Sequence, residues 1–432
     1  MVLFFNAVIM FYIFTFAQIV LLVLELLLAG LVGYLLVLTV SAWRAARRQT
    51  PEPGQPAKRF AVLIPAHNEE RLLPDLLQNL AQLDYPRELF TVHVVADNCT
   101  DQTAVIARQY GAVAHERFNT AEVGKGYALQ WLLQRIWASG EPHDAIVILD
   151  ADTVVSANFL RAMSGRLARG ERVIQAYYAV RNPGRSWSVG LRYAALAVLH
   201  YLRPLGRTAL GGSAGLKGNG MVFAADVMRQ IEWTASITED IEFHMALILN
   251  GERVAFASEA VIEAEMPETL ASAASQNVRW ERGRMQMMRL YAPKLLRAAG
   301  KSVRAGQYGR AYLLLDAAME HLIPPFSVMA ALSGLFLAVS LPLPVLWRIM
   351  GTETAVWAAN LARINLYLAV ALIVGQLIYL LSGLRLVHAP KNVYMALLNI
   401  PVFVTWKVWH YGRVLLGFDS HGWIRTARND EA

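Results

Sequence analysis

Cysteine and charge are both scarce in this chain of 432 residues. Its single cysteine, Cys99, excludes an internal disulfide and fits a reducing compartment. Only 17% of the residues are charged, whereas 56% are hydrophobic, and this balance excludes an ordinary soluble protein. Internal repeats and low-complexity tracts are absent as well. We therefore expect a membrane protein that carries a folded polar portion.

A long hydrophobic run opens the chain. Its first 43 residues carry one charge, Glu25, and it ends in Arg44, Arg47 and Arg48. At about 20 residues per crossing, we expect one membrane helix preceded by an interfacial piece, with two tightly joined helices as the alternative. Basic residues beside a membrane helix usually stay in the cytoplasm, so the next domain is predicted to be cytoplasmic.

More hydrophobic runs lie near the other end. Residues 322–347 and 362–384 are each long enough to cross a bilayer. The run at 393–409 is shorter, contains Pro401 and has basic residues on both sides. A re-entrant or interfacial helix is therefore at least as well supported there as a full crossing.

Between these runs, a linker at residues 50–58 opens a region with the alternation of an α/β fold. Short apolar runs predict strands at 60–64, 90–95 and 145–149, and periodic leucines or amphipathic stretches predict helices at 69–83 and 103–110. Strands that alternate with helices indicate a mainly parallel sheet, whose ligand crevice lies beyond the carboxyl ends of the strands. The acidic residues that follow those ends are Glu69, Asp97, Asp150 and Asp152.

Asp150 and Asp152 are the clearest candidates for chemistry in this region. Side chains alternate along an extended backbone, so both carboxylates point to one side and offer oxygen ligands to a hard divalent cation. Two carboxylates at a strand end also repel each other, and a bound cation would stabilise them.

Three other polar motifs have a structural interpretation beside the functional one. Residues 97–101 are typical of a turn that caps the following helix. Residues 238–242 are acidic either because they begin a helix or because they take part in a reaction. Lys125 lies between two glycines, as a solvated loop residue would, or as a point charge beside a diphosphate would.

Residues 276–280, with the sequence Gln-Asn-Val-Arg-Trp, join the polar region to the later hydrophobic runs. In a helix, Gln276, Arg279 and Trp280 share one face, although membrane-interface helices are often rich in Arg and Trp in any case. From residue 285 to about 310 the chain is basic and amphipathic, which is typical of a helix on a leaflet surface. The net charge of +7 gathers beside apolar segments, so lipid head groups are better partners than nucleic acid.

The joint order of these motifs resembles the membrane-embedded family 2 glycosyltransferases. That group includes hyaluronan, chitin and cellulose synthases, bacterial poly-N-acetylglucosamine synthases and ceramide glucosyltransferase. The resemblance covers residues 58–284 through the motifs at 64–70, 97–101, 124–126, 150–152, 238–240 and 276–280. The tail, with residues 406–407 and 423–428, also looks like that of bacterial members.

The resemblance implies an α/β GT-A-type domain that binds a nucleotide sugar, most often a UDP-sugar, combined with an α-helical transmembrane region. It implies Mg²⁺ or Mn²⁺ on the diphosphate, held by Asp152 and Asp150, and Asp240 as the general base with Glu239 beside it. Inversion would then give a β-linkage. The implied donor-binding residues are Ala66, Glu69, Asp97, Lys125, Asp150 and Arg279, and the implied acceptor-binding residues are Gln276, Trp280, Gly218, Asn219 and Gly220. Ala96 stands where relatives often have a further Asp, which removes one nucleoside contact.

The expected organisation has five parts. These are an N-terminal transmembrane segment (1–48), a cytoplasmic GT-A domain (58–270), amphipathic interfacial helices (271–320), C-terminal transmembrane helices (321–412) and a basic tail (413–432). This arrangement predicts a multi-pass protein of the bacterial inner membrane.

Three functions are weighed on this basis. The favoured one is an inverting transfer to a growing polysaccharide or glycoconjugate, with a homo-oligomer or an export partner as candidate helpers. The alternative is a non-processive transfer to a lipid acceptor. The third, an inactive scaffold or transporter subunit, is disfavoured because Asp152, Asp240 and Arg279 are all present.

Overall fold

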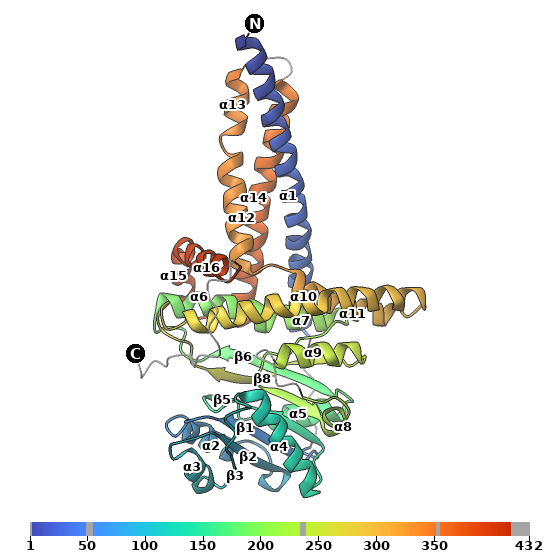
Figure 1. The fold of residues 1–432 in the computed structure, drawn as a ribbon, viewed down its shortest axis with the longest axis vertical. Coiled ribbons are helices and arrows are strands. Elements are labelled where there is room, and N and C mark those ends of the chain that lie inside the picture. Colours follow the sequence, from blue (N-terminus) through green and yellow to red (C-terminus); the bar gives the residue numbers. More distant parts are fainter. Residues whose placement is uncertain (1, 49–54, 234–238, 351–354, 416–432) are drawn as a thin grey trace.

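The computed structural model describes residues 2–48, 55–233, 239–350 and 355–415. Figure 1 shows three tiers along the long axis: a bundle of long helices, a layer of helices lying across its foot, and an α/β domain. Thr238 of the predicted acidic motif and residues 423–428 of the predicted tail lie outside the described residues.

One mixed sheet of eight strands forms the centre of the α/β domain. Its order is β3-β2-β1-β4-β7-β6-β8-β5. The strands are β1 (Phe60–Ala66), β2 (Phe90–Asp97), β3 (Val113–Arg117), β4 (Ala145–Ile148), β5 (Thr153–Val155), β6 (Val173–Val180), β7 (Met221–Ala224) and β8 (Val254–Ala264).

The predicted parallel arrangement holds for β3, β2, β1 and β4. In the other half, β7 runs antiparallel to both β4 and β6, β8 is parallel to β6, and β5 is antiparallel to β8. The expectation of a mainly parallel sheet holds for four of the seven strand pairings, and the other three make the sheet mixed. Helices still separate the strands after residue 150, but they bring β7 in antiparallel beside β4 and β6, so alternation alone does not determine strand direction.

Alternation along β1 divides the core between the two faces of the sheet. Phe60, Val62 and Ile64 pack with helices α2 and α5, whereas Ala61 and Leu63 pack with α4. The helices of this domain are α2 (Leu73–Ala81), α3 (Thr103–Gln109), α4 (Lys125–Ser139), α5 (Phe159–Ala168) and α8 (Ala225–Gln230), with the short η1 (Arg87–Leu89). Both faces are apolar, so the strand ends carry the polar chemistry.

A layer of helices lies between the sheet and the bundle (Figure 1). It contains α6 (Trp187–Leu196), the π-helical turn η2 (Ala197–Leu202), α7 (Arg203–Ala209), α9 (Glu239–Leu249), α10 (Ala274–Arg304), α11 (Tyr308–Leu322), α15 (Lys391–Ala396), η3 (Leu397–Asn399) and α16 (Ile400–Leu415). The basic helix expected at 285–310 is the second half of α10, which already begins at Ala274.

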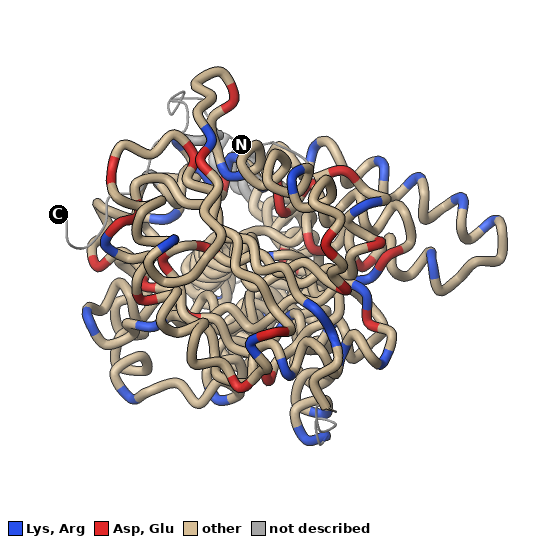
Figure 2. Tube along the Cα trace, turned by 90° about the horizontal axis from the view of Figure 1, so that it is seen from below, with Lys and Arg blue, Asp and Glu red and all other residues tan. Residues whose placement is uncertain are grey.

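The part of α10 and α11 that reaches beyond the sheet is basic. Figure 2 shows Lys and Arg along this protruding pair. Residues 282–315 contain eight Lys and Arg and neither Asp nor Glu. This charge pattern agrees with the prediction of a helix beside anionic lipid head groups.

The apolar bundle consists of α1 (Val2–Ala46), α12 (Phe326–Ser340), α13 (Leu343–Met350) and α14 (Ala355–Leu386). Three helical stretches of the described residues are long and apolar enough to cross a membrane: Phe11–Ala46, Phe326–Arg348 and Val356–Leu386. α1 is one continuous helix of 45 residues, which favours one helix over two joined helices, and an interfacial piece at its start stays a prediction. The α16 helix is not among the three stretches, and it lies across the foot of the bundle (Figure 1).

The helical layer is locked to the bundle at close range. A Cβ atom on Gly206 of α7 would lie 2.4 Å from the carbonyl oxygen of Leu38 in α1, so only glycine permits this approach. Beside it, Arg207 is buried and donates to both carboxylate oxygens of Asp316 in α11, at 2.8 to 3.2 Å. Tyr34 of α1 donates to the same carboxylate at 3.3 Å. The contacts connect three elements that are far apart in the sequence.

Candidate active site

A cavity of about 960 Å³ opens between the carboxyl ends of the strands, the helical layer and the foot of the bundle. Ten residues predicted from the sequence line it, although they come from distant parts of the chain. They are Glu69, Lys125, Asp150, Asp152, Gly218, Glu239, Asp240, Gln276, Arg279 and Trp280. The topology therefore brings most of the predicted site together.

Four predicted site residues do not line this cavity: Ala66, Asp97, Asn219 and Gly220. The Asp97 carboxylate is buried and accepts a hydrogen bond from Arg117 Nη1 at 2.7 Å. Asn219 supports the wall instead, because its Oδ1 accepts from the backbone N–H of Asp150 at 3.1 Å. A Cβ on Gly220 would lie 2.8 Å from Ile262 Cγ2, so this glycine serves close packing. The donor and acceptor roles of these four residues stay predictions.

Lys125 is held in the cavity wall at the first turn of α4. Its ammonium group donates to Asp150 Oδ1 and to the carbonyl oxygen of Gly218. Burial alone would lower the pKa of Lys125, but Asp150, Glu239 and Asp240 outweigh it and raise that pKa. The lysine is therefore a fixed positive charge beside the strand ends. The functional interpretation of the Gly-Lys-Gly motif, with Lys125 beside a diphosphate, stays a prediction.

Glu239 and Asp240 begin α9 and face the same cavity. Burial, with the neighbouring Asp240 charge, raises the pKa of Glu239 to about 7. Burial also raises the pKa of Asp240, although Lys125 and the backbone N–H groups at the helix N-terminus oppose this shift. A Cβ on Gly218 would lie 3.2 Å from Asp240 Oδ2, so the glycine leaves this carboxylate accessible from the cavity. A carboxylate of raised pKa is suited to accept a proton.

Asp150 and Asp152 fit a divalent cation that is shared with a substrate. Both line the cavity, and Thr153 Oγ1 donates to the Asp150 carbonyl oxygen at 2.8 Å, which fixes the turn between them. Within the described residues, this place does not bring three protein ligands together. Mg²⁺ is commonly held by one or two carboxylates and completed by substrate phosphate oxygens. Two carboxylates beside a diphosphate site meet that requirement.

The side of the cavity toward the bundle is apolar. Its lining there includes Phe326, Ala330, Leu380, Leu397, Ile400, Phe403 and Val404. These residues come from α12, α14, η3 and α16. The carboxylates and the apolar wall thus share one continuous space, which reaches from the strand ends to the foot of the bundle.

Several cationic side chains of this wall were not predicted as site residues. Arg192 is buried and donates to the carbonyl oxygens of Pro267 and Thr269, both at 3.1 Å, and its burial lowers its pKa to about 10. Lys407 of α16 donates to Asn277 Oδ1 at 2.6 Å and lies 3.5 Å from Glu281. Asn277 and Glu281 lie one turn apart on α10, and this spacing was the only signal in the sequence. The pairing of Lys407 with Glu281 spans 126 residues, so it can be recognised only from the fold.

Comparison with known proteins identifies the α/β domain. The family model described as glycosyltransferase like family 2 matches residues 56–283, which is more than half of the chain. The chain is 27% identical over 239 residues to a β-monoglucosyldiacylglycerol synthase of Synechocystis sp., covering 54% of this chain and 49% of that protein. It is 31% identical over 139 residues to a 4,4'-diaponeurosporenoate glycosyltransferase of Staphylococcus haemolyticus, covering 30% and 35% respectively.

Among solved structures, the chain is similar to a mannosyltransferase from Pyrobaculum calidifontis in complex with GDP-Man and Mn²⁺. The identity is 17%, the TM-score is 0.48, and the match covers 83% of this chain and 98% of that one. The chain spans about half the length of the first two β-monoglucosyldiacylglycerol synthases that it matches. On the family match, the chain belongs to glycosyltransferase family 2 and is an enzyme with a GT-A-like fold of mixed sheet joined to a helical region.

Proposed function

We propose that the protein transfers a sugar from a nucleotide sugar, most simply a UDP-sugar, to a hydroxyl group of a membrane lipid. The observation that carries this proposal is the continuity of the cavity from its carboxylates to its apolar wall. A polar head group fits beside Asp240 while the attached tails lie against Phe326, Leu380 and Phe403. The name of one relative, a β-monoglucosyldiacylglycerol synthase, supports a lipid acceptor.

The donor is expected to lie at the strand ends, with its diphosphate between Asp150, Asp152 and Arg279. Arginine grips phosphate oxygens in a bidentate manner, and Lys125 adds a positive charge at the same wall. Mg²⁺ or Mn²⁺ held by Asp150 and Asp152 would neutralise the charge that develops on the leaving diphosphate. Glu69, which also lines the cavity, is expected to contact the nucleoside.

Asp240 acts as the general base in this proposal. It takes the proton of the acceptor hydroxyl while the acceptor oxygen bonds to the anomeric carbon. The bond from that carbon to the diphosphate oxygen breaks on the opposite face, so the nucleoside diphosphate leaves and the configuration inverts. An α-linked donor thereby gives a β-linked product. Glu239 raises the proton affinity of the pair because two neighbouring carboxylates disfavour double ionisation.

The acceptor is expected to enter from the bundle side and to lie along α10. Gln276 and Trp280 offer an amide and an aromatic plane to the head group, and Trp280 is 41% exposed. The proposal places the three candidate spans in the bacterial inner membrane, with the enzyme domain on the cytoplasmic side. Arg44, Arg47 and Arg48 at the end of α1 support this orientation.

The test uses the purified protein in liposomes, with radiolabelled nucleotide sugars, Mg²⁺ or Mn²⁺, and a panel of lipids that bear a free hydroxyl group. We expect label to move into the organic phase as a lipid with one sugar, and inclusion of the acceptor lipid to be required. Label in a water-soluble polymer made without added lipid would contradict the lipid acceptor and favour the polysaccharide synthase instead. The matched control is Asp240→Asn in the same liposomes, which should give background label.

A further inference from the structure

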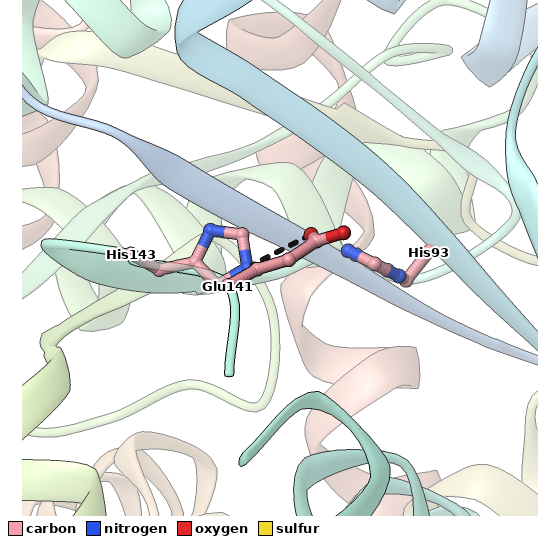
Figure 3. Close-up of side chains that lie close together, drawn as sticks. All are labelled: His93, Glu141 and His143. Atoms are coloured by element: carbon pink, nitrogen blue, oxygen red, sulfur yellow. Dashed lines mark ion pairs between the residues drawn. The ribbon is translucent and has the colours of Figure 1, made fainter. Parts of the chain in front are cut away.

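Three side chains that could hold a metal ion lie together outside the cavity. His93 is on β2, and Glu141 and His143 are in the loop between α4 and β4. Figure 3 shows the Glu141 carboxylate between the two imidazole rings. One ligand atom from each residue lies within 4.8 Å of the other two. None of the three lines the cavity described above.

Two of these ligand atoms are buried without a hydrogen-bond partner. Among the described residues, neither His93 Nε2 nor His143 Nε2 has a hydrogen-bond partner. Only 6% of His93 is exposed. A buried polar atom without a partner costs about 1–3 kcal/mol, so its retention points to a ligand. His143 Nε2 is 3.7 Å from the Glu141 carboxylate, which is beyond hydrogen-bonding distance.

The other nitrogen of His93 is already held. His93 Nδ1 lies 3.2 Å from Nε2 of His115 on the neighbouring strand β3. If His93 Nδ1 carries the proton and donates it to His115, the lone pair of Nε2 points at Glu141 and His143. Metal-binding histidines are usually oriented in this way by a partner on the second ring nitrogen.

We propose that His93 Nε2, His143 Nε2 and the Glu141 carboxylate bind a divalent transition-metal ion of the Zn²⁺ class, with His115 as the residue that positions His93. Two imidazoles and a carboxylate are ligands that zinc accepts, and a water molecule completes four-coordination. The site is separate from the oxygen-rich pair Asp150 and Asp152, which suits Mg²⁺ or Mn²⁺.

The three ligand atoms need to move only a short distance to bind a metal ion. Tetrahedral zinc with bonds of about 2.0–2.2 Å keeps its ligand atoms roughly 3.4 Å apart, so the present spacing must close by about 1 Å. Glu141 can supply this movement because its side chain is 59% exposed and lies in a loop. A bound ion would join the start of β4 to the middle of β2. Because β4 leads directly to Asp150, a bound ion would stiffen this strand and the cavity wall that follows it.

The experiment uses the full-length protein, stripped of metal by a chelator and then kept in excess Mg²⁺ so that the carboxylate site is occupied. Zinc is added, and bound zinc per chain is counted by elemental analysis after desalting. We expect one tightly bound Zn²⁺ per chain in the wild type. His93→Ala and Glu141→Gln should each weaken zinc binding by more than about 100-fold, and His115→Gln by about 10- to 100-fold.

His388→Asn is the matched control, because it also removes one histidine but lies in the loop between α14 and α15. Its φ of 52° is a conformation that Asn tolerates. This variant should keep wild-type zinc affinity. Glu141→Gln changes an exposed loop residue, so it reports on binding even if His93→Ala fails to fold. Wild-type zinc affinity in Glu141→Gln and His93→Ala, or no saturable zinc in the wild type, would overturn the proposal.

Discussion

Two groups of carboxylates in and beside the cavity differ in how their charge is compensated. Asp316 and Glu320 of α11 share the guanidinium of Arg207, whose Nη1 donates to Glu320 at 2.6 Å. Glu239 and Asp240 of α9 lie beside each other, with Lys125 as the nearby cation. Burial alone would raise the pKa of Glu320, but Arg207, Lys217 and Arg203 lower it well below its usual value. By contrast, burial and the neighbouring Asp240 charge raise the pKa of Glu239 to about 7.

This difference in charge compensation suits the first group to a structural role and the second to a chemical one. A buried carboxylate that is paired with arginine stays ionised and holds two elements together, and removing one partner is costly. A buried carboxylate pair without full compensation is ready to exchange a proton, and such groups gather at active sites. The same substitution, Asp to Asn, should therefore have opposite consequences at the two groups. This contrast can be tested position by position.

The largest effect is expected from Asp240→Asn. An amide cannot accept the acceptor proton, so turnover should fall about a thousandfold, which corresponds to roughly 4 kcal/mol in the barrier. Binding of the nucleotide should stay near the wild-type value, because the base does not hold the diphosphate. Initial-rate assays with a lipid acceptor, and titration calorimetry with UDP, measure the two quantities. Normal turnover in this variant would show that the base has been misassigned.

The matching change in the other group, Asp316→Asn, should act on stability. It removes the carboxylate that accepts from Arg207, Tyr34 and the backbone N–H of Ser213. We expect a loss of about 3 kcal/mol in the free energy of unfolding, because a buried guanidinium keeps only part of its compensation. Thermal unfolding in lipid nanodiscs measures this, with Asp240→Asn as the control of equal chemistry. Equal stability of the two variants would remove the contrast between the groups.

Asp152→Asn should have a smaller effect, confined to binding that depends on metal. With Mn²⁺ present, the affinity for UDP is expected to fall about 10- to 100-fold, because one oxygen ligand is weakened. With a chelator present, the variant and the wild type should bind UDP equally. An equal loss of affinity under both conditions would mean that Asp152 contacts the nucleotide directly rather than through a cation.

The smallest effect is a displacement of the pH profile. Because the base must be ionised and burial raises the pKa of Asp240, kcat/KM should rise with pH above the usual carboxyl range and then level off. Glu239→Gln removes the neighbouring negative charge, so the pKa of Asp240 should fall and the rise should move to lower pH. Rates between pH 5 and pH 9 at low substrate concentration test this. An unmoved profile would show that the two carboxyl groups titrate independently.

Short-range sequence patterns correctly predicted several strands and helices of the α/β domain. The strands at 60, 90 and 145 and the helices after them follow from short apolar runs and leucine periodicity, and the structure contains them. The direction of β7 does not follow, because it depends on which strand the chain reaches after the helical layer. The position of the bilayer boundary along α1 does not follow either, because a helix that is apolar on all sides gives no signal for it.

The candidate site shows the same division. Motif residues that follow strands arrive in one cavity because parallel strand ends share an edge. Asp97 follows a strand too, yet its carboxylate pairs with Arg117, whose position on β3 fixes that contact. The pairing of Glu281 with Lys407 joins helices that no sequence pattern relates. Long-range ion pairs therefore mark the limit of what spacing alone can reveal.

The close contact of Gly206 with Leu38 has a consequence for substrate choice under the proposed function. Since the two backbones touch, α7 cannot slide along α1, and the floor below the catalytic carboxylates stays at one level above the hydrocarbon. An acceptor must then carry its reactive oxygen at that same level. Lipids whose reactive hydroxyl lies nearer to the membrane or farther from it would miss the base even if their shape and charge were suitable. The distance of the hydroxyl from the membrane thus becomes a criterion of acceptor selection.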